Sequence, residues 1–333
     1  MALRLLRKQG RGGSAEDPTA GLRIYYASDL HGSESCWRKF LAAPKFYKAS
    51  VLILGGDLAG KVLVPIVEED SGRRTATFMG ERHELRDDAQ VEELEQRIRF
   101  NGLYPYRTTA ARVDELSGDP ALAARVFEDV LVAELQRWCD LADERLSDEV
   151  QAFAICGNDD PWSLDEPLRN SRRLTFCDDQ VVEVGGHELL SLSYANRTPW
   201  DSERELDEDE LYRRIERLAS QLERPEHAIF NLHVPPYDSG LDVAPQLDDE
   251  LKPVMSGGAP VSIPVGSTAV RQAIEEFQPL LSLHGHIHEC RGATTIGRTL
   301  AVNPGSDYAS GRIDGWVGNV AEGEVHRHQL VSG

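Results

Sequence analysis

Cysteine is scarce in this 333-residue chain, with five residues scattered at positions 36, 139, 156, 177 and 290. Their number is odd and no Cys-x-x-Cys pair occurs, which argues against a disulfide framework and against a structural zinc knuckle. This cysteine usage fits a reducing compartment, so we expect a cytoplasmic protein.

The chain also has few long apolar runs and fewer positively than negatively charged residues. No run approaches the roughly 20 apolar residues that a membrane-spanning helix needs. The basic opening segment is too briefly apolar for a secretory signal, so residues 1–21 are expected to form a flexible N-terminal tail. Lys and Arg number 36 against 56 Asp and Glu, a formal net charge of −20. Such a surface repels polyanions, which argues against nucleic-acid and anionic-membrane partners.

Short apolar runs alternate with amphipathic stretches, a pattern that predicts an α/β layered domain. Strands are expected at 22–27, 50–54, 151–156, 227–232 and 279–283, and helices at 34–43, 206–222 and 267–277. Two hairpins are expected around Gly185-Gly186 and Gly297-Arg298, since glycine turns separate two short strand-like runs in each case.

Residues from about 61 to 150 separate two of the expected strands by far more than the dozen residues that a crossover requires. This segment contains an expected hairpin, 61–67 with 74–79, and expected helices at 87–100 and 120–146. We interpret it as a cap inserted into the main domain. The alternative is that this segment only adds to the packing of the main domain.

Five short polar motifs each follow or close a buried strand. They are Asp29-Leu-His31, Gly55-Gly56-Asp57-Leu-Ala-Gly60, Gly157-Asn158-Asp159-Asp160, His233 in Asn-Leu-His-Val-Pro-Pro, and His284-Gly-His286-Ile-His288. Ligands of open α/β sheets collect at the carboxyl ends of strands, so these motifs can converge on one site. In Asp29-Leu-His31 alternate residues point the same way and can hold one ion together, and His286 and His288 have the same i, i+2 geometry of two ligands on one side.

The residue types in these motifs favour a metal centre. Mixed imidazole and carboxylate ligands suit Mn, Fe, Zn, Co or Ni better than Ca or Mg. We expect two divalent or trivalent ions, with Mn²⁺ the ion that supports activity in vitro, and Asp57 placed to bridge them. Two such ions would clamp a phosphoryl oxygen and acidify a bridging water. Each motif alone would be an ordinary turn or core histidine, whereas all five at strand ends predict a metal site.

The succession of motifs resembles that of the calcineurin-like metallophosphoesterase superfamily: D-x-H, G-D-x-x-G, G-N-[HDE], H and G-H-x-H. The match covers about 22–60 and 151–310. The resemblance implies a four-layer αββα sandwich of two mixed β-sheets with outer helices, spanning 22–333 with the cap inserted. It also implies the ligand sets: Asp29, His31 and His288 for one ion, Asn158, His233 and His286 for the other, and Asp57 for both.

One position departs from that pattern. Many members of the superfamily have a histidine after the asparagine, acting as the general acid, where this chain has Asp159. Asp159 could donate a proton if it is buried, or only orient a neighbouring ligand, and a cap histidine such as His83 could replace it. Weaker acid catalysis favours good leaving groups, and superfamily members with G-N-x-D sites are often phosphodiesterases. The resemblance therefore implies diester or anhydride chemistry, and the expected reaction is phosphodiester hydrolysis by a metal-bridging hydroxide. The alternatives are a phosphomonoesterase for a nucleotide, sugar phosphate or phosphoprotein, and a catalytically inactive metal-binding interaction module.

Substrate-binding residues for a small phosphate ester are also suggested by the sequence. Lys61 could neutralise a phosphate, and Asn196 and Arg197 follow an expected strand, with the arginine offering a bidentate fork. Alternatively, these side chains lie on surface loops and are solvated. Trp162 and Trp200 could line a pocket, although core packing is the ordinary role of tryptophan.

Overall fold

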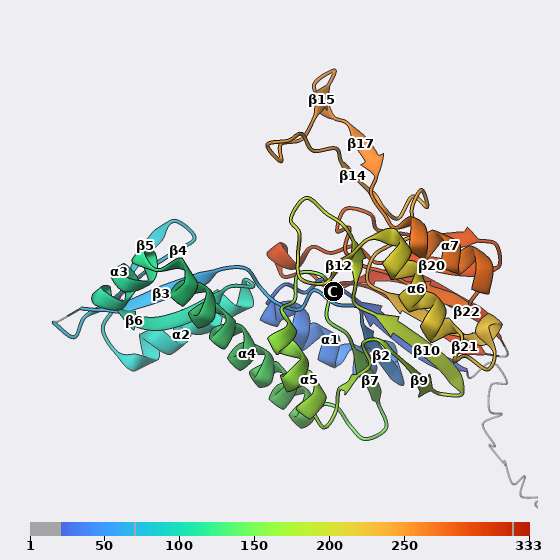
Figure 1. The fold of residues 1–333 in the computed structure, drawn as a ribbon. Helices are drawn as coiled ribbons and strands as arrows, with labels where there is room; N and C mark the ends of the chain where they lie inside the picture. Colours follow the sequence, from blue (N-terminus) through green and yellow to red (C-terminus); the bar gives the residue numbers. More distant parts are fainter. Residues whose placement is uncertain (1–20, 70, 322) are drawn as a thin grey trace, which may run out of the picture.

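Two six-stranded mixed sheets lie face to face in the body of the molecule, and helices cover their outer faces (Figure 1). This architecture is seen in a computed structural model that describes residues 21–69, 71–321 and 323–333. Residues 1–20 of the expected tail therefore lie outside the described residues. The predicted αββα sandwich is confirmed.

The first sheet carries three of the expected strands at its centre. Its order is β22 (Glu324–Ser332), β21 (Asp314–Ala321), β1 (Leu22–Ala27), β2 (Val51–Leu54), β7 (Gln151–Ala154) and β8 (Thr175–Phe176). The strands from β1 to β8 run parallel, while β21 is antiparallel to both β1 and β22. The long C-terminal hairpin of β21 and β22 thus extends a parallel core.

The second sheet has a similar build. Its order is β19 (Gly292–Ile296), β20 (Thr299–Asn303), β18 (Leu281–Leu283), β13 (Ile229–Leu232), β10 (His187–Leu192) and β9 (Gln180–Val184). The strands from β20 to β10 are parallel, and the two edges are the expected hairpins around the glycine turns. Strand β13 begins later than predicted because a 3-10 turn, η2 (Pro225–His227), precedes it.

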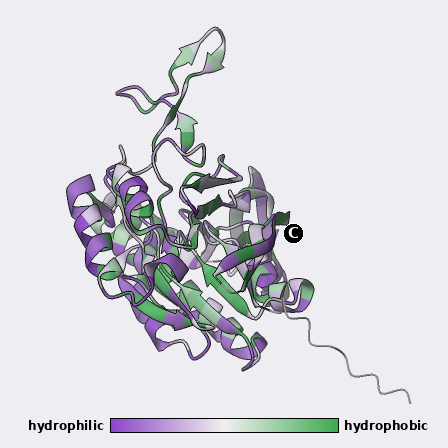
Figure 2. Cartoon of the chain, turned by 90° about the vertical axis from the view of Figure 1, so that its right-hand side faces the viewer, coloured by the Kyte–Doolittle hydropathy of each residue, from purple (hydrophilic) through white to green (hydrophobic). Residues whose placement is uncertain are grey.

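Successive side chains of each strand point to opposite faces of its sheet, so the core is divided into layers. In β1, Ile24 and Tyr26 face the space between the two sheets, whereas Tyr25 and Ala27 face the outer helices. Because both faces are buried, these strands read in sequence as unbroken apolar runs. Figure 2 shows hydrophobic residues concentrated in the strands of the body and hydrophilic residues on the outward surfaces of the helices.

Helices pack on the outer face of each sheet. Helices α1 (Glu34–Tyr47), α4 (Pro120–Arg145) and α5 (Asp165–Asn170) cover the first sheet, and α6 (Glu208–Ala219) and α7 (Thr268–Phe277) cover the second. The Ser33 side chain caps α1 by accepting from the Cys36 N–H. The helix continues past its predicted end at residue 43, with Pro44 accommodated inside it. No helix in the described ranges is long and apolar enough to cross a bilayer.

The segment inserted between β2 and β7 folds around a small core of its own. Strands β3 (Leu63–Glu68), β4 (Arg74–Phe78), β5 (Glu81–Leu85) and β6 (Tyr104–Thr109) form a sheet of order β5-β4-β3-β6. Helix α2 (Asp88–Phe100) packs on this sheet, and α3 (Ala110–Gly118) leads into α4, which returns to the body. The hairpin of β3 with β4 and the helices α2 and α4 were expected, while β5, β6 and α3 were not.

A narrow arm and a short strand pair complete the chain. The arm projects from the body between β13 and α7 (Figure 1) and contains β14 (Val243–Pro245), β15 (Met255–Ser256), β16 (Ala259–Pro260) and β17 (Ser262–Pro264). Strands β11 (Ala195–Asn196) and β12 (Glu205–Leu206) pair in the loop before α6. None of these short strands was predicted, because they have too few residues to show a period.

The contact between α1 and α4 fixes the end of the inserted segment to the body. The Trp37 and Trp138 rings stack with centroids 5.1 Å apart and an interplanar angle of 5°. The Trp37 indole N–H also donates to the Trp138 carbonyl at 3.2 Å. Replacing Trp37 by alanine should lower the free energy of unfolding by about 3–5 kcal/mol, since a large buried side chain is lost.

Phe46 on the same helix supplies the control, because it is 79% exposed whereas Trp37 is 1% exposed. Phe46→Ala should change the free energy of unfolding by no more than about 0.5 kcal/mol. Urea denaturation of both variants measures the difference. Equal losses for the two would contradict the stacking as a source of stability.

Candidate metal centre

The expected ligands come together where strands of both sheets end. Two overlapping groups of side chains have ligand atoms within 4.8 Å of one another: Asp29, His31, Asp57 and His288 in the first, and Asp57, His233 and His286 in the second. Asp57 belongs to both groups. A carboxylate shared in this way is suited to bridge two cations.

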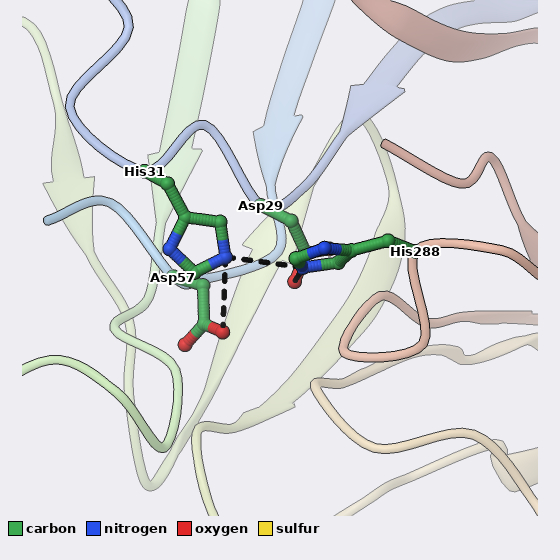
Figure 3. A group of neighbouring side chains, drawn as sticks. All are labelled: Asp29, His31, Asp57 and His288. Atoms are coloured by element: carbon green, nitrogen blue, oxygen red, sulfur yellow. Dashed lines mark hydrogen bonds and ion pairs between the residues drawn. The ribbon is translucent and has the colours of Figure 1, made fainter. Parts of the chain in front are cut away.

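The first group faces a single point, as Figure 3 shows. The His31 Nε2 atom lies 3.1 Å from His288 Nε2 and 3.6 Å from Asp57 Oδ2. The His288 Nε2 atom lies 3.4 Å from Asp29 Oδ1. Three of these four side chains are buried, and His288 is partly exposed. The group therefore has one side open to solvent.

The second group uses the other oxygen of Asp57. The His233 Nε2 atom lies 3.3 Å from Asp57 Oδ1 and 3.1 Å from Asn158 Oδ1. The Asn158 amide nitrogen donates to Ser202 Oγ at 3.4 Å, which turns its oxygen towards His233. The rings of His233 and His286 lie edge to face, with centroids 5.3 Å apart. Asn158 therefore lies beside this group, while its role as a metal ligand stays a prediction.

Hydrogen bonds on the far side of two rings fix how these histidines present their other nitrogen to the site. His31 Nδ1 faces the Ala59 carbonyl at 3.3 Å, and His233 Nδ1 faces the Gly55 carbonyl at 2.8 Å. A carbonyl only accepts, so each Nδ1 carries a proton. The Nε2 atom of each ring then points towards Asp57. The donor set fits metal ions that bind nitrogen and oxygen.

The charges of the metal-free protein support the same conclusion. Burial alone would lower the pKa of His233, but the neighbouring Asp57 carboxylate outweighs burial and raises that pKa to about 10. Burial, followed by the charge of His233, lowers the pKa of His286 to about 4. A proton on His233 therefore offsets part of the negative charge of the buried carboxylates.

The backbone is strained at several of the ligands. Left-handed φ angles of 58°, 41°, 52° and 66° occur at Asp29, His31, Asp57 and His286. Each such residue costs on the order of 1–3 kcal/mol and persists only where the surroundings enforce it. Strained residues of this kind cluster at functional sites, and here four of them surround one point.

Glycine is required at two positions of the motifs because neighbouring atoms lie too close for a Cβ atom. A Cβ atom on Gly157 would lie 2.0 Å from Asp57 Oδ1, and one on Gly285 would lie 2.3 Å from Asp29 Oδ2. Both carboxylates therefore pack directly against backbone. Any side chain at these two positions would displace a proposed ligand.

Asp160 holds together the loops that carry Asp57 and Asn158, a role that the sequence did not indicate. Its buried carboxylate accepts hydrogen bonds from the N–H groups of Leu58 at 3.0 Å, Ala59 at 2.8 Å and Gly157 at 2.8 Å. These donors lie on the loops that present Asp57 and Asn158. The second aspartate of Gly-Asn-Asp-Asp was visible in the sequence, but two of its partners lie about 100 residues away.

The segment after β20 also forms hydrogen bonds with the loops that carry the proposed ligands. Ser306 Oγ donates to the Asp29 carbonyl at 2.7 Å, and the Asn303 amide donates to the Gly285 carbonyl at 3.1 Å. The Tyr308 ring packs beside His31 with centroids 4.6 Å apart. Nothing in the local sequence around Tyr308 indicated this position.

Two of the predicted functional residues pair with each other at the edge of the centre. The Lys61 ammonium forms an ion pair with the Asp159 carboxylate. The Asp159 N–H also donates to Asp57 Oδ1 at 3.1 Å. Burial lowers the pKa of Lys61, but the Asp159 carboxylate outweighs this effect and raises it above its ordinary value. The sequence suggests separate roles for Lys61 and Asp159, whereas the structure joins them in an ion pair.

Asn196 and Arg197 contact other parts of the chain. The Asn196 amide nitrogen donates to the Val265 carbonyl at 3.4 Å, and Arg197 pairs with Asp201 at 3.2 Å and Asp207 at 3.1 Å. Among the described residues, their recorded polar partners include none of the seven proposed metal ligands. Their role in binding substrate stays a prediction.

Core packing is the wrong expectation for Trp162 and Trp200. Trp162 is 46% exposed and Trp200 is 63% exposed. Exposed tryptophan is costly in water, so both positions call for a physical explanation.

Comparison with known proteins supports the fold. No family model matches the chain. The uncharacterized protein MJ1162 of Methanocaldococcus jannaschii is 30% identical over 162 residues, which is 48% of this chain and 66% of that protein, so the match spans slightly less than two thirds of the relative. The solved structure of TT1561 from Thermus thermophilus has a TM-score of 0.52 at 13% identity and covers 94% of this chain and 98% of its own. Another solved structure has a TM-score of 0.55 at 13% identity, covering 93% and 98%. At this identity the similarity shows the fold alone.

His284 lies in the same motif as His286 and His288 but is a structural residue. Its Nδ1 donates to the carbonyls of Leu232 at 2.9 Å and Val234 at 3.0 Å, and its Nε2 accepts from Ser282 Oγ at 2.8 Å. Burial outweighs the effect of these carbonyls and lowers the pKa of His284 to about 4. The ring is therefore neutral in the folded protein at neutral pH.

This neutral histidine should make stability depend on pH. The unfolded chain binds a proton at His284 below its usual pKa of about 6.5, whereas the folded chain binds it only near 4. Its contribution is therefore complete above pH 6.5 and is lost as the pH falls to 4, a change of roughly 3 kcal/mol at most. Urea denaturation in EDTA across this range should show a steeper loss for the native chain than for His284→Asn. Parallel curves would contradict the assignment.

Proposed function

We propose that this protein is a dinuclear metal-dependent phosphoesterase of the calcineurin-like superfamily, acting on phosphodiesters. The observation that carries the proposal is the convergence of two buried carboxylates, one amide oxygen and four imidazoles around Asp57. The order of the motifs in the sequence supports the same assignment. The αββα fold is compatible with it and does not by itself specify a reaction.

The roles of the side chains follow from their positions. Asp29, His31 and His288 would hold one ion, and Asn158, His233 and His286 the other, with one Asp57 oxygen directed to each group. When bound, the two ions would supply Lewis acidity and a nucleophile at neutral pH. Because the ligands are fixed by backbone contacts before any ion arrives, the site loses little entropy on binding.

The pairing of Lys61 with Asp159 supports the preference for diesters. The Asp159 carboxylate is occupied by its ion pair with the Lys61 ammonium. The position that is a histidine in many members of the superfamily therefore offers little acid catalysis. Substrates with good leaving groups depend less on this assistance, which favours activated diesters over alkyl monoesters.

Turnover of two model substrates tests the reaction class. Protein loaded with Mn²⁺ should hydrolyse bis-p-nitrophenyl phosphate faster than p-nitrophenyl phosphate, and EDTA should abolish both activities. The reverse ratio would favour a phosphomonoesterase. Stoichiometric metal without turnover of either substrate would favour the inactive metal-binding module.

Replacement of the shared carboxylate tests the metal centre itself. Asp57→Asn keeps the shape of the side chain but removes its charge, so kcat/KM should fall by roughly 100-fold or more. Asp249→Asn in the exposed arm makes the same chemical change away from the centre and should leave kcat/KM unaltered. Metal content measured by mass spectrometry should fall only in the first variant. Full activity of Asp57→Asn would refute the proposed centre.

A further inference from the structure

Three aromatic rings pack together at one side of the candidate metal centre. The rings of His31 and His288 have centroids 4.9 Å apart and an interplanar angle of 64°. The Tyr308 ring packs against both, with its centroid 4.6 Å from that of His31 and 5.8 Å from that of His288. Its angle to the His288 ring is 86°, the edge-to-face arrangement that aromatic pairs prefer. Tyr308 therefore contacts two of the ligands proposed for the same ion.

His288 differs from two other proposed ligands in how its ring is held. The Nδ1 atoms of His31 and His233 each face a backbone carbonyl, at 3.3 Å and 2.8 Å. Within the described part of the chain, the recorded polar partners of the His288 ring are His31 and Asp29, and both lie at its Nε2 atom. A metal-binding imidazole is ordinarily oriented by a partner at its other nitrogen. For His288, the recorded contact from outside the ligand set that restricts the ring is the packing of Tyr308.

The exposure of His288 makes this restriction important. Its side chain is 31% exposed, whereas those of Asp29 and His31 are each 1% exposed. The two buried side chains are fixed by the surrounding protein, but a partly exposed side chain keeps rotational freedom that it loses when it binds an ion. A group that already restricts the His288 ring reduces this loss and so increases the affinity for the ion.

Hydrogen bonds on both sides of Tyr308 hold its segment in place. Tyr308 begins a short 3-10 turn, η3 (Tyr308–Ser310), and the Gly311 carbonyl that follows accepts from Ser35 Oγ on α1 at 3.0 Å. Before the turn, the Ser306 N–H donates to the His288 carbonyl at 3.1 Å. The segment is therefore attached both to the body and to the loop that carries His288. The ring of Tyr308 is thus placed against the two histidines by the fold itself.

We propose that Tyr308 is a positioning residue that orients His288 and thereby sets the affinity of the ion assigned to His31 and His288. The second ion is assigned to His233 and His286, whose recorded ring contact is with each other. Tyr308 therefore acts on one of the two ions. This inference rests on the proposed dinuclear centre and adds to it a residue outside the ligand set.

Titration of the full chain with Mn²⁺, followed by the EPR signal of the free ion, measures the two dissociation constants without any substrate. Tyr308→Ala should raise one constant by about 10–100-fold, the usual cost of losing a group that orients a metal ligand, and leave the other unchanged. Tyr308→Phe should keep both constants, because edge-to-face packing depends on the ring and not on the hydroxyl. A general loss of folding would weaken both ions, so a selective change separates positioning from a merely structural role.

Two further variants complete the design. Tyr212 is also a partly buried tyrosine, but it packs on the helix side of the second sheet and its hydroxyl donates to Glu276 on α7. Tyr212→Ala should therefore leave both dissociation constants unchanged. The double variant Tyr308→Ala with His288→Ala tests the route of the effect. If the tyrosine acts through His288, the double variant should bind Mn²⁺ no more weakly than His288→Ala alone.

Three results would overturn the positioning role: unchanged constants in Tyr308→Ala, equal weakening of both ions, or a further loss of affinity in the double variant. Hydrolysis of bis-p-nitrophenyl phosphate by the native chain reports separately on the proposed reaction. Turnover without any effect of Tyr308→Ala on Mn²⁺ binding would refute the positioning role and leave the phosphoesterase intact. A selective effect on one ion in a chain without turnover would do the opposite. A native chain that binds fewer than two ions would refute both.

Discussion

The burial of two carboxylates, Asp29 and Asp57, is the constraint on which the rest of the centre depends. An ionised carboxylate is costly away from water unless donors or cations surround it. Here the fold supplies backbone N–H groups to both side chains, from His286 to Asp29 and from Asp159 to Asp57. Histidines occupy other directions around these carboxylates, with His233 beside Asp57 and His288 beside Asp29. The proposed metal centre follows from this meeting of carboxylates and imidazoles.

The sandwich explains why this constraint can be met. The parallel strands of both sheets end in loops at a shared edge, so residues far apart in the chain reach one point. Hydrogen bonds between these loops, such as those received by Asp160, keep them in register. The inserted segment is fastened to the same region, because the Tyr104 hydroxyl accepts from the Gly60 N–H at 2.7 Å. The insertion is therefore connected directly to the loop that presents Asp57.

Side-chain pairs at the edge of the centre shape the chemistry that it can perform. Lys61 occupies the Asp159 carboxylate, and Arg204 covers one face of Trp162. Each pair joins residues that are far apart in sequence. The first pair lies next to a proposed metal ligand, because the Asp159 N–H also donates to Asp57.

The sequence by itself determined the strands β1, β2, β7, β13 and β18, the helices that cover them, and the polar residues that follow each strand, because these depend on local hydrophobic periods and on residue type. It located Asp29, His31 and Asp57 as candidates but carried no distances between them. Only the tertiary structure decided which Asp57 oxygen meets which histidine, that Asp160 binds two loops, and that Trp162 stays exposed on Arg204. These contacts join segments separated by tens to hundreds of residues, and no local pattern encodes the partner of a side chain across such a distance.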